Sequence, residues 1–393
     1  MIMNGKIAVL EGDRCINIVK HDVPEPNEDA MILAMGLCGI CGTDVHFYTH
    51  ATKSLVGPLL PVVLGHEICG RIERMGSKAK ESMQCDQPLK QGDRVVLYGA
   101  VPCGHCWWDR KFGTGHGLLC TDMRYGYGAS GAHVPPYFVG GFAEYLYVYP
   151  GIGLWRIPDD VSYEEAVLAE PMSIAIRAVE KATSFPGWKN EQTISFGGTV
   201  VVLGSGGIGI LTCIALKLIG AGKVILVGGA KASLDLAKEL GAADWTIDIA
   251  KGTSEARIEE VLALTEMGYG ADAVFEAAGV PVAFKDALAM VRPTGIVVEL
   301  GCLIDVGETI EINIPAQITM KDITIFSVHS QPAQDLEKAL KTILMSKDRF
   351  AYGRLVTRSY PLEQAAEAME WASSPEKVGK IALRGAGYPG PRP

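Results

Sequence analysis

A glycine-rich turn between an apolar strand and a helix constrains the fold of this chain most strongly. The apolar run Thr199–Leu203 leads directly into a G-x-G-x-x-G pattern at Gly204, Gly206 and Gly209. The first glycine permits a tight turn, the second lets a diphosphate approach the backbone, and the third lets the helix pack on the strand. The diphosphate would then lie at the positive N-terminus of the helix. The pattern predicts a dinucleotide-binding α/β unit, with a merely structural turn as the alternative.

Strands and helices alternate around this turn. We expect further buried strands over Lys223–Val227, Ala273–Glu276 and Gly295–Leu300, and helices over Glu164–Thr183, Ile208–Ile219 and Leu234–Leu240. This rhythm is typical of a doubly wound parallel sheet.

The first 160 residues have a different sequence pattern from this α/β region, because short β-branched runs are separated there by Gly, Pro and Asp. The predicted strands are Lys6–Leu10, Ile16–Lys20, Ala30–Leu37, Glu67–Met75, Arg94–Tyr98 and Phe142–Tyr149. Such runs indicate a barrel-like or sandwich β domain. Two helices, Gln334–Ser346 and Leu362–Trp371, precede a last strand at Lys380–Leu383. We therefore expect an α/β protein with a β-rich domain over 1–165, a nucleotide-binding domain over 166–327 and a C-terminal segment over 328–393.

Composition narrows the class of protein. The formal net charge is −9 and no Lys/Arg cluster occurs, which argues against nucleic-acid or anionic-membrane partners. The longest apolar run, Thr199–Leu216, is interrupted by glycines and does not resemble a membrane span. Met1–Leu10 alternates like a strand and lacks the build of a signal peptide. Ten cysteines in 393 residues fit metal ligands and buried thiols better than a disulfide scaffold, so we expect a cytoplasmic protein.

The end of the second strand of the nucleotide-binding unit lacks an acidic residue. A carboxylate is expected there, about 20 residues after the glycine turn, to bind the adenosine ribose of NAD. The sequence instead reads Gly228-Gly229-Ala230-Lys231. Nothing therefore repels a 2′-phosphate, and Lys231 is either its ion-pair partner or a solvated surface lysine. NADP is permitted, and NAD is not excluded.

A second group of chemically active residues lies near the N-terminus. Cys41-Gly-Thr43-Asp-Val-His46 is followed by Gly65-His66-Glu67. A thiolate, an imidazole and a carboxylate form a zinc shell that keeps one position open for chemistry. The alternatives are a redox-active Cys38–Cys41 pair and isolated surface groups.

Together with the glycine turn, these residues resemble the zinc-dependent medium-chain alcohol dehydrogenases. The similarity follows the chain in order through Cys41 to His46, Gly65-His66-Glu67, Gly140 to Tyr145, Glu170-Pro171, the glycine turn and Lys377-Val-Gly-Lys-Ile. It implies a GroES-like catalytic domain and a Rossmann coenzyme domain. It also implies that Cys41 and His66 bind a catalytic zinc and that Glu67 is a ligand or an exchangeable carboxylate beside it. Glu170 stands where other members have a third cysteine, as in the sorbitol, threonine and glucose dehydrogenase branch.

The same resemblance assigns roles around the reaction. Thr43 would contact the substrate oxygen, and His46 would complete a proton relay to solvent. The alternative is a structural role for both side chains. The expected cofactor-binding residues are Gly204, Gly206, Gly207, Ile208, Gly209, Gly228, Lys231, Ala278 and Gly279.

Cys103, Cys106, Asp109 and Cys120 resemble the structural-zinc lobe of this family, which normally carries four cysteines. Asp109 falls at the third position here. Three thiolates and a carboxylate suit zinc, and His105 or His116 are further candidate ligands. The alternative is a lobe that has lost its metal.

The resulting hypothesis is an NAD(P)-dependent enzyme that reversibly oxidises a small alcohol, with a secondary alcohol or polyol preferred, and with zinc as a Lewis acid. The alternatives are a zinc-free quinone or enoyl reductase of the same superfamily and a non-catalytic nucleotide-binding protein. In members of this family, the strands at the positions of Ile296–Gly301 and Ile310–Ile314 extend the sheet across a two-fold axis. We therefore expect a homodimer or homotetramer. Phe47, Tyr48, Trp107 and Trp108 indicate either an aromatic pocket or core packing.

Overall fold

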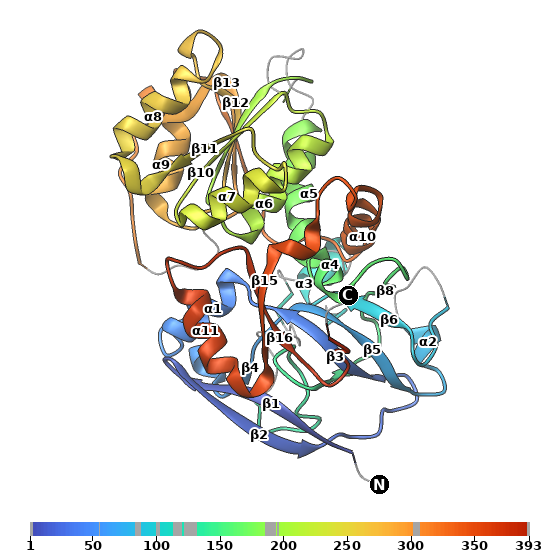
Figure 1. Ribbon diagram of the computed structural model, residues 1–393. Helices are drawn as coiled ribbons and strands as arrows, with labels where there is room; N and C mark the ends of the chain where they lie inside the picture. Colours follow the sequence, from blue (N-terminus) through green and yellow to red (C-terminus); the bar gives the residue numbers. More distant parts are fainter. Residues whose placement is uncertain are drawn as a thin grey trace.

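The structure is a computed structural model that describes residues 3–54, 56–82, 88–99, 103–112, 120–121, 132–184, 194, 196–301 and 307–390. Figure 1 shows these residues arranged in two lobes, one built on a helix-flanked sheet and the other mainly on antiparallel strands. The chain passes from the β-rich lobe to the α/β lobe through α5 (Ala169–Thr183) and returns at its C-terminal end.

The α/β lobe is built on a parallel sheet that has six strands within the described residues. These are β9 (Thr199–Leu203), β10 (Lys223–Gly228), β11 (Trp245–Asp248), β12 (Ala271–Glu276), β13 (Val291–Glu299) and β14 (Thr324–Ser327), in the order β11-β10-β9-β12-β13-β14. The order reverses between β9 and β12. In open α/β sheets, ligands bind at the carboxyl ends of the strands beside such a reversal. The predicted doubly wound sheet is confirmed.

Helices cover both faces of this sheet. They are α6 (Gly207–Leu218), α7 (Lys231–Glu239), α8 (Ser254–Ala263) and α9 (Pro281–Met290), with α5 and α10 (Asp335–Ser346) completing one layer. Val200 and Val202 belong to the core shared with α5 and α6, whereas Val201 and Leu203 belong to the core shared with α9. Burial on both faces explains why this strand reads as an unbroken apolar run.

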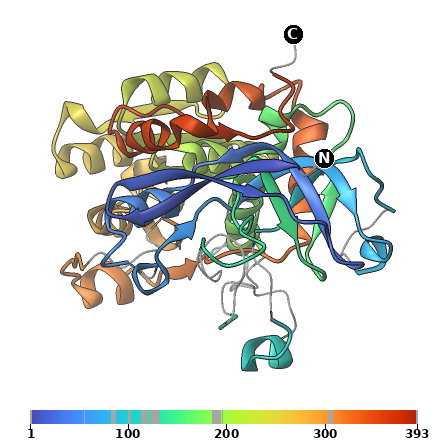
Figure 2. The same ribbon diagram turned by 90° about the horizontal axis from the view of Figure 1, so that it is seen from below.

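The β-rich lobe contains a seven-stranded sheet and a three-stranded sheet within the described residues. The larger comprises β3 (Met31–Gly39), β5 (Glu67–Met75), β6 (Arg94–Leu97), β7 (Tyr145–Val148), β8 (Leu154–Arg156), β15 (Val356–Pro361) and β16 (Lys380–Arg384), and the smaller comprises β1 (Asn4–Gly12), β2 (Cys15–Asp22) and β4 (Val62–Val63). Because β16 pairs antiparallel with β3, the C-terminal strands complete the sheet of the N-terminal residues. Figure 2 shows β1 and β2 crossing this lobe.

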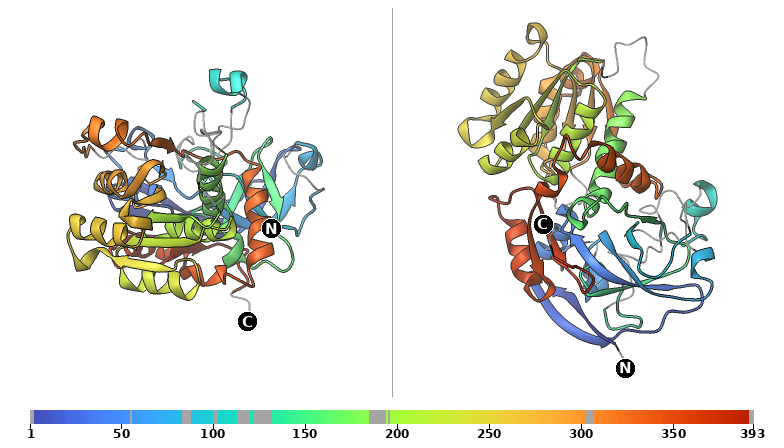
Figure 3. Two further views of the ribbon diagram at one scale, coloured as in Figure 1. Left: turned by 90° about the horizontal axis from the view of Figure 1, so that it is seen from above. Right: turned by 45° about the vertical axis from the view of Figure 1, so that its right-hand side comes forward.

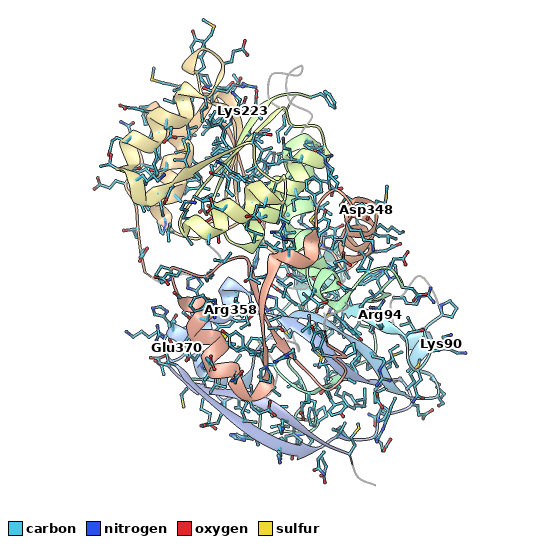
Figure 4. All side chains as sticks on the ribbon, viewed as in Figure 1. Lys90, Arg94, Lys223, Asp348, Arg358 and Glu370 are labelled. Carbon is cyan, nitrogen blue, oxygen red and sulfur yellow. The ribbon has the colours of Figure 1, made fainter. Side chains whose placement is uncertain are left out.

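Shorter elements join these layers. The helices are α1 (Gly42–Thr49), α2 (Ala79–Ser82), α3 (Trp107–Phe112), α4 (Tyr163–Ala166) and α11 (Ala365–Ser373); one-turn 3₁₀ helices lie at Gly57–Leu59, Ile249–Lys251, Glu266–Gly268, Tyr352–Leu355 and Leu362–Gln364, and a π-helix lies at Pro315–Thr319. Arg94, labelled in Figure 4, donates to the carbonyls of Val161 at 2.9 Å and Pro158 at 3.0 Å, which fixes the segment before α4. Figure 3 shows α3 standing away from the rest of the molecule.

Several expected elements differ from the structure. The predicted helix Glu164–Thr183 is two helices, and α4 starts at a capping box in which Ser162 and Glu165 bond each other's backbone N–H groups. Residues 308–313, where a strand across a two-fold axis was expected, are irregular in the single chain, and Ile314 caps the π-helix. Phe47 and Tyr48 are core residues, 2% and 1% exposed, and not pocket walls. None of the helices in the described part of the chain has the length and apolarity that a membrane span needs.

Candidate active site

A cavity of about 320 Å³ lies between the two lobes. One side is formed by the start of α1 with Cys41, Thr43 and His46. The other side is formed by the glycine turn at Gly206–Ile208 and by the turns that follow β12 and β13. The cavity therefore joins the carboxyl ends of the parallel strands to the cysteine motif of the β-rich lobe.

Cys41, His66 and Glu67 meet at one edge of this cavity. One ligand atom of each residue lies within 4.8 Å of the others, a spacing that suits a single metal ion. His66 and Glu67 are 6% and 0% exposed. Cys41 is the N-cap residue of α1, while Glu67 begins β5. Residues 25 positions apart in the sequence are thus brought together, as the sequence predicted.

Asp44 and Lys380 support this group, and sequence reasoning gave neither a role. Asp44 is fully buried; its carboxylate accepts the N–H of Cys41 at 2.9 Å and the N–H of Gly65 at 3.2 Å. It therefore ties the cysteine turn to the turn before His66. Lys380 Nζ donates to Glu67 Oε1 at 2.5 Å and to the Ile40 carbonyl at 3.3 Å. The sequence contained one signal for each residue. Asp44 is the third residue of a helix N-terminus, a position at which a carboxylate bonds the N-cap backbone, and Lys380 is the lone lysine of an apolar C-terminal strand.

The electrostatics of the group favour a cation. Burial lowers the pKa of His66, but the charges of Asp44 and Cys41 and their hydrogen bonds outweigh burial and raise this pKa well above its ordinary value. Likewise, burial lowers the pKa of Lys380, and the charges of Glu67 and Cys41 raise it on balance. Glu67 Oε2 is buried with no hydrogen-bond partner among the described residues. A soft thiolate, an imidazole and a spare carboxylate oxygen fit zinc.

Glu170 lies outside the cluster of three. It stands in the first turn of α5, and its Oε1 accepts a hydrogen bond from Gln331 Nε2 at 3.0 Å. Desolvation raises the pKa of Glu170, while the nearby charges of His66 and Glu67 act in opposite directions. The structure thus brings Glu170 near the cluster but not within the 4.8 Å spacing of its members.

Thr43 and His46 lie on α1 and line the cavity. Thr43 Oγ1 is 3.7 Å from Cys41 Sγ, which places the hydroxyl beside the sulfur of the Cys41–His66–Glu67 cluster. Burial, followed by the charges of His50 and Lys377, lowers the pKa of His46. These surroundings favour the neutral form of the imidazole.

The glycine turn has the geometry that its sequence requires. Gly204 has a φ of +105°, and a Cβ on it would approach Ala278 N to 2.6 Å. A Cβ on Gly209 would collide with the Gly204 carbonyl. In contrast, a Cβ on Gly206 would meet nothing within 4 Å, so the space above it is open. Gly206, Gly207, Ile208, Ala278 and Gly279 line the cavity, whereas Gly204, Gly209, Gly228 and Lys231 do not.

The adenosine end of the predicted nucleotide site is shaped by Gly228 and Lys231. Gly228 ends β10, and a Cβ there would lie 2.5 Å from Ser205 Cβ and 2.7 Å from Ser205 N, so no side chain fits. Ser205 Oγ donates to the Gly229 carbonyl at 2.6 Å and holds this turn. Lys231 begins α7 and forms an exposed ion pair with Asp235. Lys231 is therefore available to a ligand only in competition with Asp235.

Cys103, Cys106, Asp109 and Cys120 form a second cluster, with one ligand atom of each within 4.8 Å of the others. Backbone N–H groups point at the sulfurs: Cys106 N lies 3.2 Å from Cys103 Sγ, and Cys103 N lies 3.2 Å from Cys120 Sγ. Asp109 Oδ1 is buried with no hydrogen-bond partner in the described part of the chain. Burial opposes ionisation of Asp109, but the Gly104 N–H and the three thiols lower its pKa. Three thiols and a carboxylate fit zinc.

Of the two histidines considered as further ligands, His105 is described in the structure and does not belong to this cluster. His105 is exposed, and its ring lies 3.0 Å from the Cys103 carbonyl. His116 lies outside the described residues. Trp107, on the same lobe, is 61% exposed.

Comparisons with known proteins agree with this geometry. Residues 27–159 match the family model of the alcohol dehydrogenase GroES-like domain, and residues 207–345 match that of the zinc-binding dehydrogenases. Sorbitol dehydrogenase of Bacillus subtilis is 31% identical over 369 residues, covering 94% of each chain. A probable D-xylulose reductase A of Aspergillus fumigatus is 32% identical over 294 residues, covering 75% of this chain and 74% of the relative.

A solved structure supports both the fold and the nucleotide site. A zinc-binding dehydrogenase from Sinorhizobium meliloti, bound to NADP, has a TM-score of 0.76 and 28% identity, and the match covers 97% of this chain and 99% of that one. The chain belongs to the zinc-dependent medium-chain alcohol dehydrogenases, in their sorbitol dehydrogenase branch: NAD(P)-linked oxidoreductases that act on CH–OH donors.

Proposed function

We propose that this enzyme interconverts a secondary alcohol of a small polyol and the corresponding ketone. The observation that carries the proposal is the single cavity in which Cys41, Thr43 and His46 face the glycine turn and the turn at Ala278 and Gly279. An alcohol held at the cysteine cluster and a nicotinamide held at the strand ends would meet there. The polyol class is supported by the relatives named for sorbitol and D-xylulose.

We propose the following division of labour within the site. Cys41, His66 and Glu67 hold zinc, with Glu170 as a carboxylate held nearby by Gln331. When bound, the zinc supplies a Lewis acid that acidifies the substrate hydroxyl, and the nicotinamide supplies the hydride acceptor. Thr43 accepts the hydroxyl proton as its own hydroxyl proton passes on toward His46, which completes the relay to solvent. Asp44 keeps α1 and the His66 turn in register during the reaction.

The proposal is tested with the purified, zinc-loaded protein. Sorbitol, xylitol, 2,3-butanediol and ethanol are offered with NAD⁺ and with NADP⁺, and reduction is followed at the absorbance of the reduced nicotinamide. We expect the diol and polyols to be oxidised faster than ethanol. Reduction of quinones or enones by a protein inactive on all four alcohols would instead favour the zinc-free reductase.

The lobe around α3 is proposed to hold a second, structural zinc. Its support is the cluster of Cys103, Cys106, Asp109 and Cys120, together with the partnerless Asp109 Oδ1 noted above. None of these four residues lines the cavity, so this site takes no part in the chemistry. Metal analysis is expected to find two zinc ions per chain.

We also propose the domain division 1–165, 166–327 and 328–393, and a cytoplasmic location. The first is supported by β15 and β16, which join the sheet of β3 although they follow the α/β lobe in the chain. The second is supported by the cysteines, none of which forms a disulfide within the described residues. A fragment of residues 166–327 that fails to fold would contradict the domain division. Secretion of the native protein would contradict the cytoplasmic location.

We also propose a homodimer or a dimer of dimers. β14 is the edge strand of the parallel sheet, and β13, which the sequence analysis placed at the interface, is interior. Ile325 of this edge strand is 39% exposed, and Ile314 and Met320, at the ends of the π-helix that precedes it, are 59% and 82% exposed. An apolar edge is a surface for self-association. Light scattering at micromolar concentration is expected to give at least twice the monomer mass, and a monomer there would refute the proposal.

The enzyme is predicted to use both NAD and NADP, with at most a mild preference for NADP. Because Lys231 is exposed and paired with Asp235, its contact with a 2′-phosphate is worth only a several-fold change in affinity. Lys231→Ala should therefore lower the NADP:NAD ratio of kcat/KM several-fold, and the matched variant Asp235→Asn, which frees Lys231, should raise it. A wild-type preference for NAD of a hundredfold or more would contradict this interpretation of the site.

A further inference from the structure

Two glutamates end neighbouring strands beneath the cavity. Glu276 is the last residue of β12 and Glu299 the last of β13, and the two stand opposite each other in the strand register. Glu276 is fully buried, and its Oε1 accepts the N–H groups of Ala278 at 2.7 Å and Gly279 at 3.0 Å. Glu299 Oε1 accepts the N–H of Gly301 at 2.9 Å. Together the two carboxyl groups bind three backbone donors of the turns that follow their strands.

The two carboxyl groups also lie against each other. A Cβ built on Gly301 would lie 2.5 Å from Glu276 Oε2, so the glycine that donates to Glu299 also covers Glu276. Neighbouring carboxylates repel each other when both are ionised, which favours the protonated form of the more buried Glu276. In agreement, burial and then the charge and hydrogen bond of Glu299 raise the pKa of Glu276 to about 8.

The turns that this pair holds face the reactive groups. Ala277 to Val280 and Leu300 to Gly301 line the cavity, whose opposite wall carries Cys41 and Thr43. Neither glutamate lines the cavity itself. The backbone of these two turns is therefore held in place by side chains that a bound ligand would not contact.

We propose that Glu276 and Glu299 are positioning residues, whose paired carboxyl groups fix these two turns so that they receive the nicotinamide end of the dinucleotide. This inference rests on the proposed function, because it assumes that the ring lies between the turns and the cysteine cluster. One carboxyl group alone would leave either the turn after β12 or the turn after β13 without its acceptor.

The test compares two replacements of Glu299. Glu299→Leu removes the acceptor of the Gly301 N–H, and we expect it to weaken binding of NADH and NADPH, and to raise the cofactor KM, roughly tenfold. Glu299→Gln keeps an acceptor oxygen for Gly301 and offers its amide N–H to Glu276, so it should restore both values to within about threefold of wild type. Binding is followed by cofactor fluorescence and folding by thermal unfolding. Glu260→Leu, on the exposed surface of α8, is the control and should change neither value.

The outcomes separate this inference from the proposed function. If Glu299→Leu binds both cofactors like wild type, or if Glu299→Gln binds them as weakly as Glu299→Leu, the glutamate pair does not position the turns. If Glu299→Leu does not fold, the smaller truncation Glu299→Ala takes its place with the same expectation. Wild-type protein that binds neither cofactor would overturn the proposed function and this inference with it, whereas tight wild-type binding without alcohol oxidation would overturn only the former.

Discussion

Replacing Cys41 with serine is expected to abolish alcohol oxidation while cofactor binding stays within a few-fold of wild type. The thiolate is one of three residues whose ligand atoms lie within 4.8 Å of one another, and its loss removes the strongest zinc ligand of the group. A Lewis acid contributes several kcal/mol to such a reaction, so turnover should fall roughly 10³-fold or more. Serine is itself a good N-cap residue, and α1 should therefore keep its start and its bond to Asp44.

The matched control for this change is Cys106→Ser. It removes one thiolate from the second cluster, so both variants should lose one zinc per chain by metal analysis. Only Cys41→Ser should lose turnover, because the second cluster lies outside the cavity. Cys106→Ser should instead show a lower temperature of thermal unfolding. Full activity of Cys41→Ser after removal of its metal would refute the catalytic site.

The parts of the fold that could be predicted from sequence are those with strong local signals. The run Thr199–Leu203 and the glycines after it have few structural interpretations, and the parallel sheet formed as expected. The strand β11 was missed, because Trp245–Asp248 is only partly buried at the sheet edge and lacks an apolar run. Likewise, β14 alternates intermediate and exposed positions over four residues. Such strands are specified by their neighbours and not by their own sequence.

The site likewise contains residues that could be predicted from the sequence and residues that could not. Cys41, His66 and Glu67 were predictable because few residue types bind zinc and their motifs are compact. Lys380 was not, because nothing local indicates that a strand 313 residues after Glu67 returns to pair with β3 and delivers its ammonium to that carboxylate. The Glu276–Glu299 pair depends similarly on the register of β12 with β13. Interactions that arise from strand order are set by the whole sheet, so the sequence can mark Lys380 as unusual but cannot name its partner.

Gly206→Val should produce the opposite pattern to Cys41→Ser: the zinc content stays at the wild-type value, but NADH and NADPH bind roughly 100-fold more weakly. A Cβ at Gly206 meets nothing within 4 Å, and the residue has φ −74° and ψ −177°, an extended conformation that valine adopts readily. The protein itself therefore accommodates the side chain. The diphosphate, which must approach this backbone at the start of α6, does not, and overpacking of that kind costs about 3 kcal/mol at its upper range.

The contrast with Gly204 makes this prediction specific. Gly204→Ala places a methyl group against the backbone of Ala277 and Ala278 in a left-handed conformation, so it should lower the free energy of unfolding as well as cofactor affinity. Gly206→Val should leave the thermal unfolding midpoint within a few degrees of wild type. Fluorescence titration with NADH and NADPH, run beside thermal unfolding, distinguishes the two. Wild-type cofactor affinity in folded Gly206→Val would mean that no diphosphate passes over this turn, and that the open space above Gly206 serves another ligand.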